Sequence, residues 1–187
     1  MGSQRHHRPA ARRLLIVCNP IERYTLTRPC GDLSDHSEFQ PYCTPQEMLE
    51  VGVFEGKYLN STQHEFPRSW FAHARLSEKA NPSLNCFGVK SRTPQSEWQA
   101  RGWVHPQDPL GWFQWYCRFY LGRRSDDDVR QIKRWAAFSR HSRQVAMYGG
   151  GDINKRRRQR QALLQWSHDP FPDCHKHPER VTNQIPR

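Results

Sequence analysis

The run of residues between Gly111 and Gly122 constrains the fold most, because it contains six aromatic residues and no helix breaker. One set of these side chains recurs at the i, i+3, i+4, i+7 spacing of a single helix face: Trp112, Trp115, Tyr116 and Phe119. Phe113 and Tyr120 widen that face, so the predicted helix is apolar almost all round and must be covered by other elements. Asp108 can cap this helix and Pro109 suits its first position, which predicts a central helix from Asp108 to Gly122.

Two further helices are predicted after the central one. Ser125 and the carboxylates at 126–128 favour a helix start there, because negative charge is stabilised at the helix N-terminus. We expect its buried stripe to be Val129, Ile132 and Ala136, and we expect a third helix from about 154 to 166. The segments 53–70 and 72–92 show no helical period, and their aromatic residues could pin irregular loops onto the core. The predicted fold class is mainly α: a small single domain with a three-helix cluster, aromatic-pinned irregular loops and disordered termini.

The domain limits follow from composition. A chain of 187 residues is long enough for one ordinary domain. Residues 1–43 show almost no periodicity and are predicted to be a flexible basic and polar tail. The helical domain is expected over 44–168, opening with a helix capped by Thr44 and Glu47, and 169–187 is predicted to be a Pro-rich flexible tail. No run approaches the roughly 18 apolar residues of a membrane span, so none is expected.

The positive charge is concentrated in one part of the chain. The formal net charge is +11, and residues 118–160 contain 13 basic and four acidic groups. Clustered Arg and Lys attract polyanions, which makes a nucleic-acid-associated, non-enzymatic protein our leading hypothesis. The residues predicted to contact nucleic acid are Arg118, Arg123, Arg124, Arg130, Lys133, Arg134, Lys155, Arg156, Arg157, Arg158 and Arg160. The competing interpretation is that these cations solvate helix faces or pair with carboxylates such as those at 126–128.

A second hypothesis is an accessory enzyme or small-molecule-binding protein of a biosynthetic pathway. Its pocket would be lined by Trp103, His105, Asp108, Trp112 and Tyr116. His105 and Asp108 stand three apart around a turn and have the chemistry of a base and an acid. The sequence leaves open whether the protein is an enzyme, identifies no catalytic residue and identifies no protein partner.

Metal and cofactor sites are not expected. The chain has six Cys but no C-x2-C pair, which a structural zinc site usually needs, and it has no phosphate-binding or dinucleotide-binding glycine motif. We therefore predict no metal and no cofactor. No segment has the pattern of a secretory signal peptide, so reduced cysteines and a nuclear or cytoplasmic location are expected.

One stretch carries a resemblance to a known group of proteins. The segment Gly111–Arg124 reads GWFQWYCRFYLGRR, and further matches lie at Gly52–Tyr58, Glu65–Pro67 and Phe87–Lys90. Over about half of the chain, from Gln46 to Trp135, the sequence resembles a widespread family of uncharacterised hypothetical proteins that carry this type of motif. The resemblance implies no activity and no catalytic residues, and it does not extend to 1–43 or to the basic run at 155–160.

Overall fold

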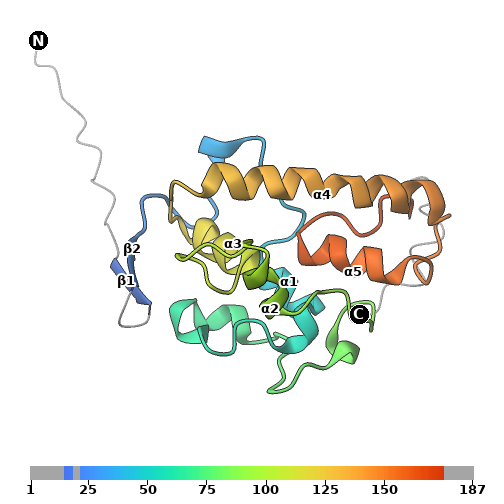
Figure 1. Ribbon diagram of the computed structural model, residues 1–187, viewed down its shortest axis with the longest axis horizontal. Helices are drawn as coiled ribbons and strands as arrows, with labels where there is room; N and C mark the ends of the chain where they lie inside the picture. The colour runs from blue at the N-terminus through green and yellow to red at the C-terminus, as the bar shows by residue number, and fades with distance from the viewer. Residues whose placement is uncertain (1–14, 19–21, 175–187) are drawn as a thin grey trace, which may run out of the picture.

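Helices make up most of the regular structure. The computed structural model describes residues 15–18 and 22–174 (Figure 1). Its α-helices are α1 (Pro45–Val51), α2 (Gln95–Ala100), α3 (Trp112–Leu121), α4 (Asp128–Tyr148) and α5 (Arg157–Gln165). Short 3₁₀ turns are η1 (Ser34–His36), η2 (Phe54–Gly56), η3 (Gln63–Glu65), η4 (Arg68–Phe71) and η5 (Pro82–Leu84). Strands β1 (Leu15–Cys18) and β2 (Glu22–Thr25) form an antiparallel hairpin in which Leu15 pairs with Thr25 and Cys18 with Glu22. The predicted mainly helical fold is confirmed.

Helix α3 is the centre of the core, as its sequence predicts. Trp115, Tyr116 and Phe119 have no solvent exposure. The ring of Phe39 lies among them, with centroids 5.5–5.6 Å away, and also meets Trp135 of α4 at 4.9 Å. Aromatic pairs at such distances add to the stabilisation from buried area. Large rings therefore supply core volume that a chain poor in aliphatic residues lacks.

Helix α4 is the longest element and lies along one side of the molecule, with α5 beside it (Figure 1). Ile132 is buried as expected, but Val129 is 55% exposed and Ala136 is also exposed, so the predicted buried stripe is wrong at these two positions. The inward face instead carries the polar side chains of Asp128 and Gln131 together with Ile132 and Trp135. Asp128 accepts a hydrogen bond of 2.8 Å from Trp115 Nε1, which turns the start of α4 toward α3.

The ordered domain is wider than 44–168. Phe39 is 2% exposed, and the carbonyl of Gly122 accepts hydrogen bonds from the amides of Thr27 and Arg28. At the other end Asp173 and Cys174 are buried. The predicted tail limits are therefore wrong for 26–43 and 169–174, because one buried ring and a few backbone hydrogen bonds fix segments that show no periodicity. The rest of both predicted tails, 1–14, 19–21 and 175–187, lies outside the described residues.

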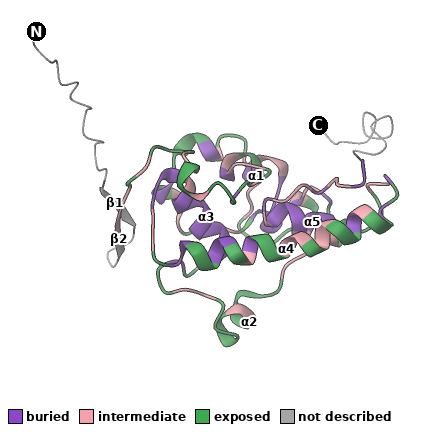
Figure 2. Cartoon of the chain, turned by 90° about the horizontal axis from the view of Figure 1, so that it is seen from above, coloured by how far each residue is buried: buried purple, intermediate pink, exposed green. Residues whose placement is uncertain are grey.

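The segment that carries α2 forms an arm. Figure 2 shows α2 on an extended, largely exposed loop that stands apart from the other helices, and none of its residues is buried. The arm leads back to α3 through Gly111, whose φ of 84° lies in the region that favours glycine. A Cβ at Gly111 would lie 3.4–3.6 Å from Tyr58 Oη and the Trp98 ring, so the chain passes close to both. The arm thus brings its tryptophans back over the first turn of α3.

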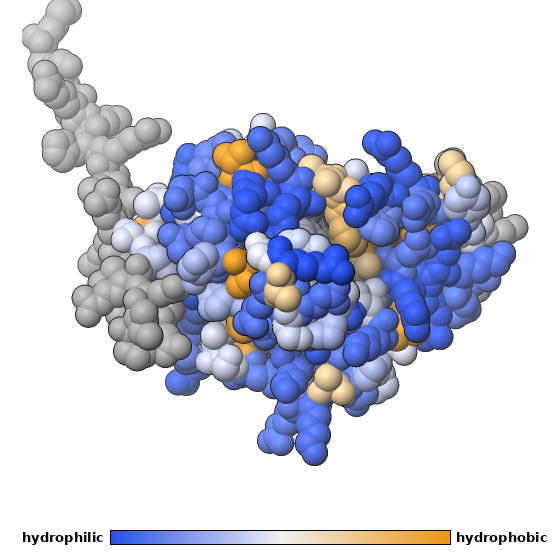
Figure 3. Space-filling view, in the orientation of Figure 1, coloured by the Kyte–Doolittle hydropathy of each residue, from blue (hydrophilic) through white to orange (hydrophobic). Residues whose placement is uncertain are grey.

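The surface is mainly polar. Hydrophobic residues show only in scattered patches on the face drawn in Figure 3. Among the described residues, no helix combines the length and apolar character needed to cross a membrane.

Candidate functional site

An aromatic cavity of about 420 Å³ lies between the α2 arm, the start of α3, and helices α4 and α5. This volume falls within the roughly 300–1,000 Å³ typical of small-molecule sites. Eight ring side chains line it: Phe54, Tyr58, Trp98, Trp103, Trp112, Phe113, Phe138 and Trp166. They come from separate segments, so the fold assembles a continuous aromatic wall from residues far apart in the sequence.

Stacking between rings fixes the deep wall of this aromatic cavity. The Trp112 ring packs 4.9 Å from Trp166 and 5.2 Å from Tyr116, and Phe138 stacks on Trp166 at 5.1 Å with an interplanar angle of 12°. Trp103 of the arm is 41% exposed, so it lies at the mouth. A rigid stacked wall with one exposed ring at its edge suits a flat ligand, because aromatic side chains lose little conformational entropy on contact.

Three arginines add positive charge to the aromatic cavity: Arg92, Arg134 and Arg140. Arg92 pairs with the buried Glu55 at 3.2 Å. Arg134 is half-buried, and its Nη1 donates to the carbonyl of Trp103 at 3.3 Å and to Gln131 Oε1 at 3.1 Å. Burial lowers the pKa of Arg134 below its ordinary value, and the positive charge of Arg130 acts in the same direction.

Two residues that line this cavity have polar atoms without partners. Trp112 is 5% exposed, and its indole Nε1 is buried without a hydrogen-bond acceptor. Arg92 Nε is likewise buried without a partner. A buried donor that lacks an acceptor costs about 1–3 kcal/mol, so these groups favour a ligand that supplies an acceptor. Phe54 and Glu55 also have φ values of 52° and 62°, a strained backbone of the kind that gathers at functional sites.

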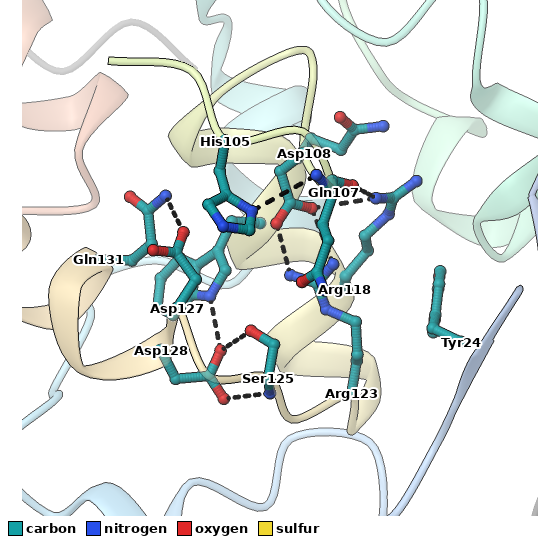
Figure 4. A network of polar contacts seen from close by, with 12 residues as sticks. Tyr24, His105, Gln107, Asp108, Arg118, Arg123, Ser125, Asp127, Asp128 and Gln131 are labelled. Carbon is teal, nitrogen blue, oxygen red and sulfur yellow. Dashed lines mark hydrogen bonds and ion pairs between the residues drawn. The ribbon is translucent and has the colours of Figure 1, made fainter. Parts of the chain in front are cut away.

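Figure 4 shows a second polar cluster, centred on Asp108, whose charged groups pair with one another. Asp108 has no solvent exposure and accepts hydrogen bonds from Arg118 at 3.0 Å and from Arg123 at 2.9 and 2.7 Å. Arg118 also pairs with Glu65, whose Oε1 accepts from the Tyr24 hydroxyl at 2.9 Å. Burial alone would lower the pKa of Arg118, but the pairing with Glu65 raises it above its ordinary value. Arg123 Nε is buried without a hydrogen-bond partner, but both carboxylates of this cluster are engaged by guanidinium groups.

The predicted pocket is only partly assembled. Trp103 and Trp112 line the aromatic cavity, whereas His105, Asp108 and Tyr116 do not. Tyr116 is fully buried and donates to the carbonyl of Cys43 at 2.7 Å. Asp108 is a counterion for two guanidinium groups, so the predicted acid–base pair with His105 is wrong. Asp108 does not cap α3 either, because the helix begins at Trp112, after Gly111.

Five of the eleven predicted nucleic-acid-binding residues form ion pairs within the protein. Arg118, Arg123 and Arg160 are buried in ion pairs, the last with Asp173 at 2.6 Å, and are therefore not part of an exposed basic surface. Arg124 pairs with Asp35 at 2.8 Å and Arg130 with Asp127 at 2.5 Å.

The remaining predicted cations lie nearer to solvent. Arg157 donates to the carbonyl of Phe87, and Arg156 lies 4.8 Å from the Tyr148 ring. Lys133, Lys155 and Arg158 are exposed, and no described carboxylate forms an ion pair with them. The number of exposed, unpaired cations is therefore smaller than the number of basic residues at 118–160 indicates.

Several residues of the aromatic cavity were not predicted from the sequence to line a pocket. Arg92, Tyr58, Phe138 and Trp166 belong to four different segments, and only the fold brings them together. The described residues contain no group of three or more His, Cys, Asp or Glu side chains arranged to hold a metal ion. Comparison with known proteins gives no matching family model, no similar curated protein and no similar solved structure. The family resemblance of the GWFQWYCRFYLGRR segment therefore stays a prediction.

Proposed function

We propose that the protein binds a small molecule with a flat, aromatic body in the aromatic cavity. The observation that carries this proposal is the wall of eight rings around a hollow of about 420 Å³. Rings held by mutual stacking bind a planar ligand at low entropic cost, and each stacked ring of a ligand contributes about 1–3 kcal/mol. The unpartnered Trp112 Nε1 adds a donor that a polar atom of the ligand would satisfy.

Binding of N-phenyl-1-naphthylamine, a flat and uncharged fluorescent probe, tests the proposal. Ala137 lines the aromatic cavity on an exposed turn of α4, so Ala137→Trp fills the cavity without removing a core contact. Ala136→Trp is the matched control, because Ala136 is also exposed but does not line the cavity. We expect the probe to bind the wild-type protein and the control equally. Ala137→Trp should weaken binding at least about tenfold, which is 1.4 kcal/mol. Equal binding by all three proteins would refute the proposal.

Contact with nucleic acid is the second candidate function, and a nuclear or cytoplasmic location would accompany it. One observation favours it: Lys133, Arg140 and Arg143 are exposed on α4, with no ion pair to a described carboxylate. Their spacing of seven and three residues places them on one stripe of the helix. Three phosphate contacts predict a log–log salt slope of about −2 on single strands. Fluorescence anisotropy with a labelled RNA at several salt concentrations measures that slope, and a flat salt dependence would remove this candidate.

A further inference from the structure

Two of the three arginines at the aromatic cavity have no carboxylate partner among the described residues. Eight arginines of the described residues each have one: Arg28, Arg92, Arg101, Arg118, Arg123, Arg124, Arg130 and Arg160. Arg134 and Arg140 both line the cavity, and neither forms an ion pair with a described residue. The cavity therefore carries two guanidinium charges that the protein does not neutralise.

Neutral groups fix the orientation of the Arg134 guanidinium. Its acceptors are two neutral oxygens, of Trp103 and Gln131, and its guanidinium lies 5.5 Å from the centroid of the Trp166 ring. These contacts orient the group without cancelling its charge. A guanidinium without a carboxylate partner binds an oxyanion more tightly than a guanidinium that is already paired. The charge-assisted hydrogen bonds to the oxyanion are also stronger in a partly buried site than in water.

From this arrangement we infer that the ligand is an aromatic base that carries a phosphate group, with the base in the aromatic cavity and the phosphate at Arg134 and Arg140. The inference rests on the proposed function and names the class of ligand. A phosphate monoester carries a charge of about −1.5 to −2 at neutral pH, which matches two free guanidinium groups better than the single charge of a carboxylate. Guanidinium also binds phosphate oxygens through two parallel hydrogen bonds.

The positions of the two arginines on α4 suit one phosphate. Arg134 and Arg140 are separated by about 9 Å along the helix axis, a span that two long side chains can close. Ala137 lies between them around the helix and presents only a methyl group, so it leaves room at the cavity edge.

The aromatic cavity also has groups that can recognise a base. Trp112 Nε1 and Arg92 Nε are buried donors without acceptors, and ring nitrogens and carbonyl oxygens of bases are acceptors. The stacked rings of Trp112, Trp166 and Phe138 offer faces for the base itself. Unpartnered donors and unpaired cations at the same cavity match a ligand that combines a base with an anion.

Such a ligand can be a free mononucleotide or the terminal nucleotide of a strand. Lys133 and Arg143 continue the exposed cations along α4 beyond Arg140, so a strand leaving the aromatic cavity would meet further positive charge. The chemistry at the cavity is the same in both cases.

The test compares two fluorescent probes, 1,N6-ethenoadenosine 5′-monophosphate and ethenoadenosine without the phosphate. We expect the phosphorylated probe to bind at least about tenfold more tightly at low salt. Arg134→Gln and Arg140→Gln should each remove most of that difference between the two probes. Arg143→Gln is the matched control, because Arg143 is exposed on the same helix but does not line the cavity. Since Arg140 is exposed, its variant remains informative even if Arg134→Gln disturbs the cavity.

The outcomes separate this inference from the proposed function. If the uncharged naphthylamine binds but the phosphate adds nothing to binding of the ethenoadenosine probes, the ligand class is wrong and the cavity function stands. If the naphthylamine does not bind, the proposed function itself fails. Competition with a short 5′-phosphorylated RNA then identifies the source: displacement as effective as by adenosine monophosphate supports a strand terminus, and weak displacement supports a free nucleotide.

Discussion

Replacing Asp108 by Asn should be among the most destabilising single changes in this protein. Asp108 is the only carboxylate of the described residues that pairs with Arg123, whereas Arg118 keeps Glu65. The amide of Asn would retain one acceptor and turn an NH₂ group toward a guanidinium, which leaves Arg123 buried without a counterion. Breaking a buried pair on one side costs about 3–5 kcal/mol, and at 0% exposure solvent does not screen Asp108. We expect a loss of about 4 kcal/mol from a total of about 5–15.

Urea unfolding followed by far-UV circular dichroism and tryptophan fluorescence measures this loss by linear extrapolation. Asp126→Asn is the matched control, because Asp126 is an exposed carboxylate just before α4 and should change stability by less than about 0.5 kcal/mol. The double variant Asp108→Asn, Arg123→Met removes both charges and should recover part of the loss. A loss below about 1 kcal/mol in the single variant would show that the Asp108 cluster is not a tightly coupled network.

Three further changes test other parts of the structure. Gly122→Ala should cost at least about 1–2 kcal/mol, because φ is 110° and a Cβ would lie 2.0 Å from the carbonyl oxygen of Arg28; limited proteolysis should then cut within 26–31, and unchanged resistance would contradict the packing described. The hydrogen bond from Arg124 lowers the pKa of Asp35 from 3.8 to about 2, so this pair should stabilise the fold above pH 4 and lose its effect as the pH falls through 2. Comparing acid unfolding of Asp35→Asn with wild type checks this, and parallel curves would disprove it. Burial lowers the pKa of His168 below 6.5, so protonation favours the unfolded state and stability should fall as the pH drops below about 6.5. His168→Asn should weaken that fall between pH 7 and 5, and an unaltered pH dependence would contradict the role of burial.

Local signals in the sequence predicted local structure well. Thr44 and Glu47 form the expected reciprocal capping box, with Thr44 Oγ1 accepting from the Glu47 amide at 3.2 Å and Glu47 Oε2 accepting from the Thr44 amide at 2.8 Å. Gly52 ends this helix as expected. Such features depend on residues three or four positions apart, and those spacings are visible in the sequence itself.

The helix start predicted at Asp108 was wrong, because residues outside the first helical turn pair with this carboxylate. Asp followed by Pro is a typical helix start, yet two arginines 10 and 15 residues away hold this carboxylate instead. Partners outside the first helical turn outcompete the local one here, and no spacing rule identifies them.

Pairing with carboxylates explains why the number of cations in a segment of the sequence is a poor guide to function here. Arg118, Arg123 and Arg160 belong to the most basic part of the chain, but the fold brings Glu65, Asp108 and Asp173 to them from segments near and far. A cation with a buried carboxylate partner has no free charge to offer a ligand, however many cations surround it in the sequence. Arg134 combines half-burial with the lack of a carboxylate partner among the described residues, since neighbouring neutral oxygens and a tryptophan ring hold the group but leave its charge intact. We therefore expect an anion to bind at Arg134 in preference to the arginines that already have a buried carboxylate partner.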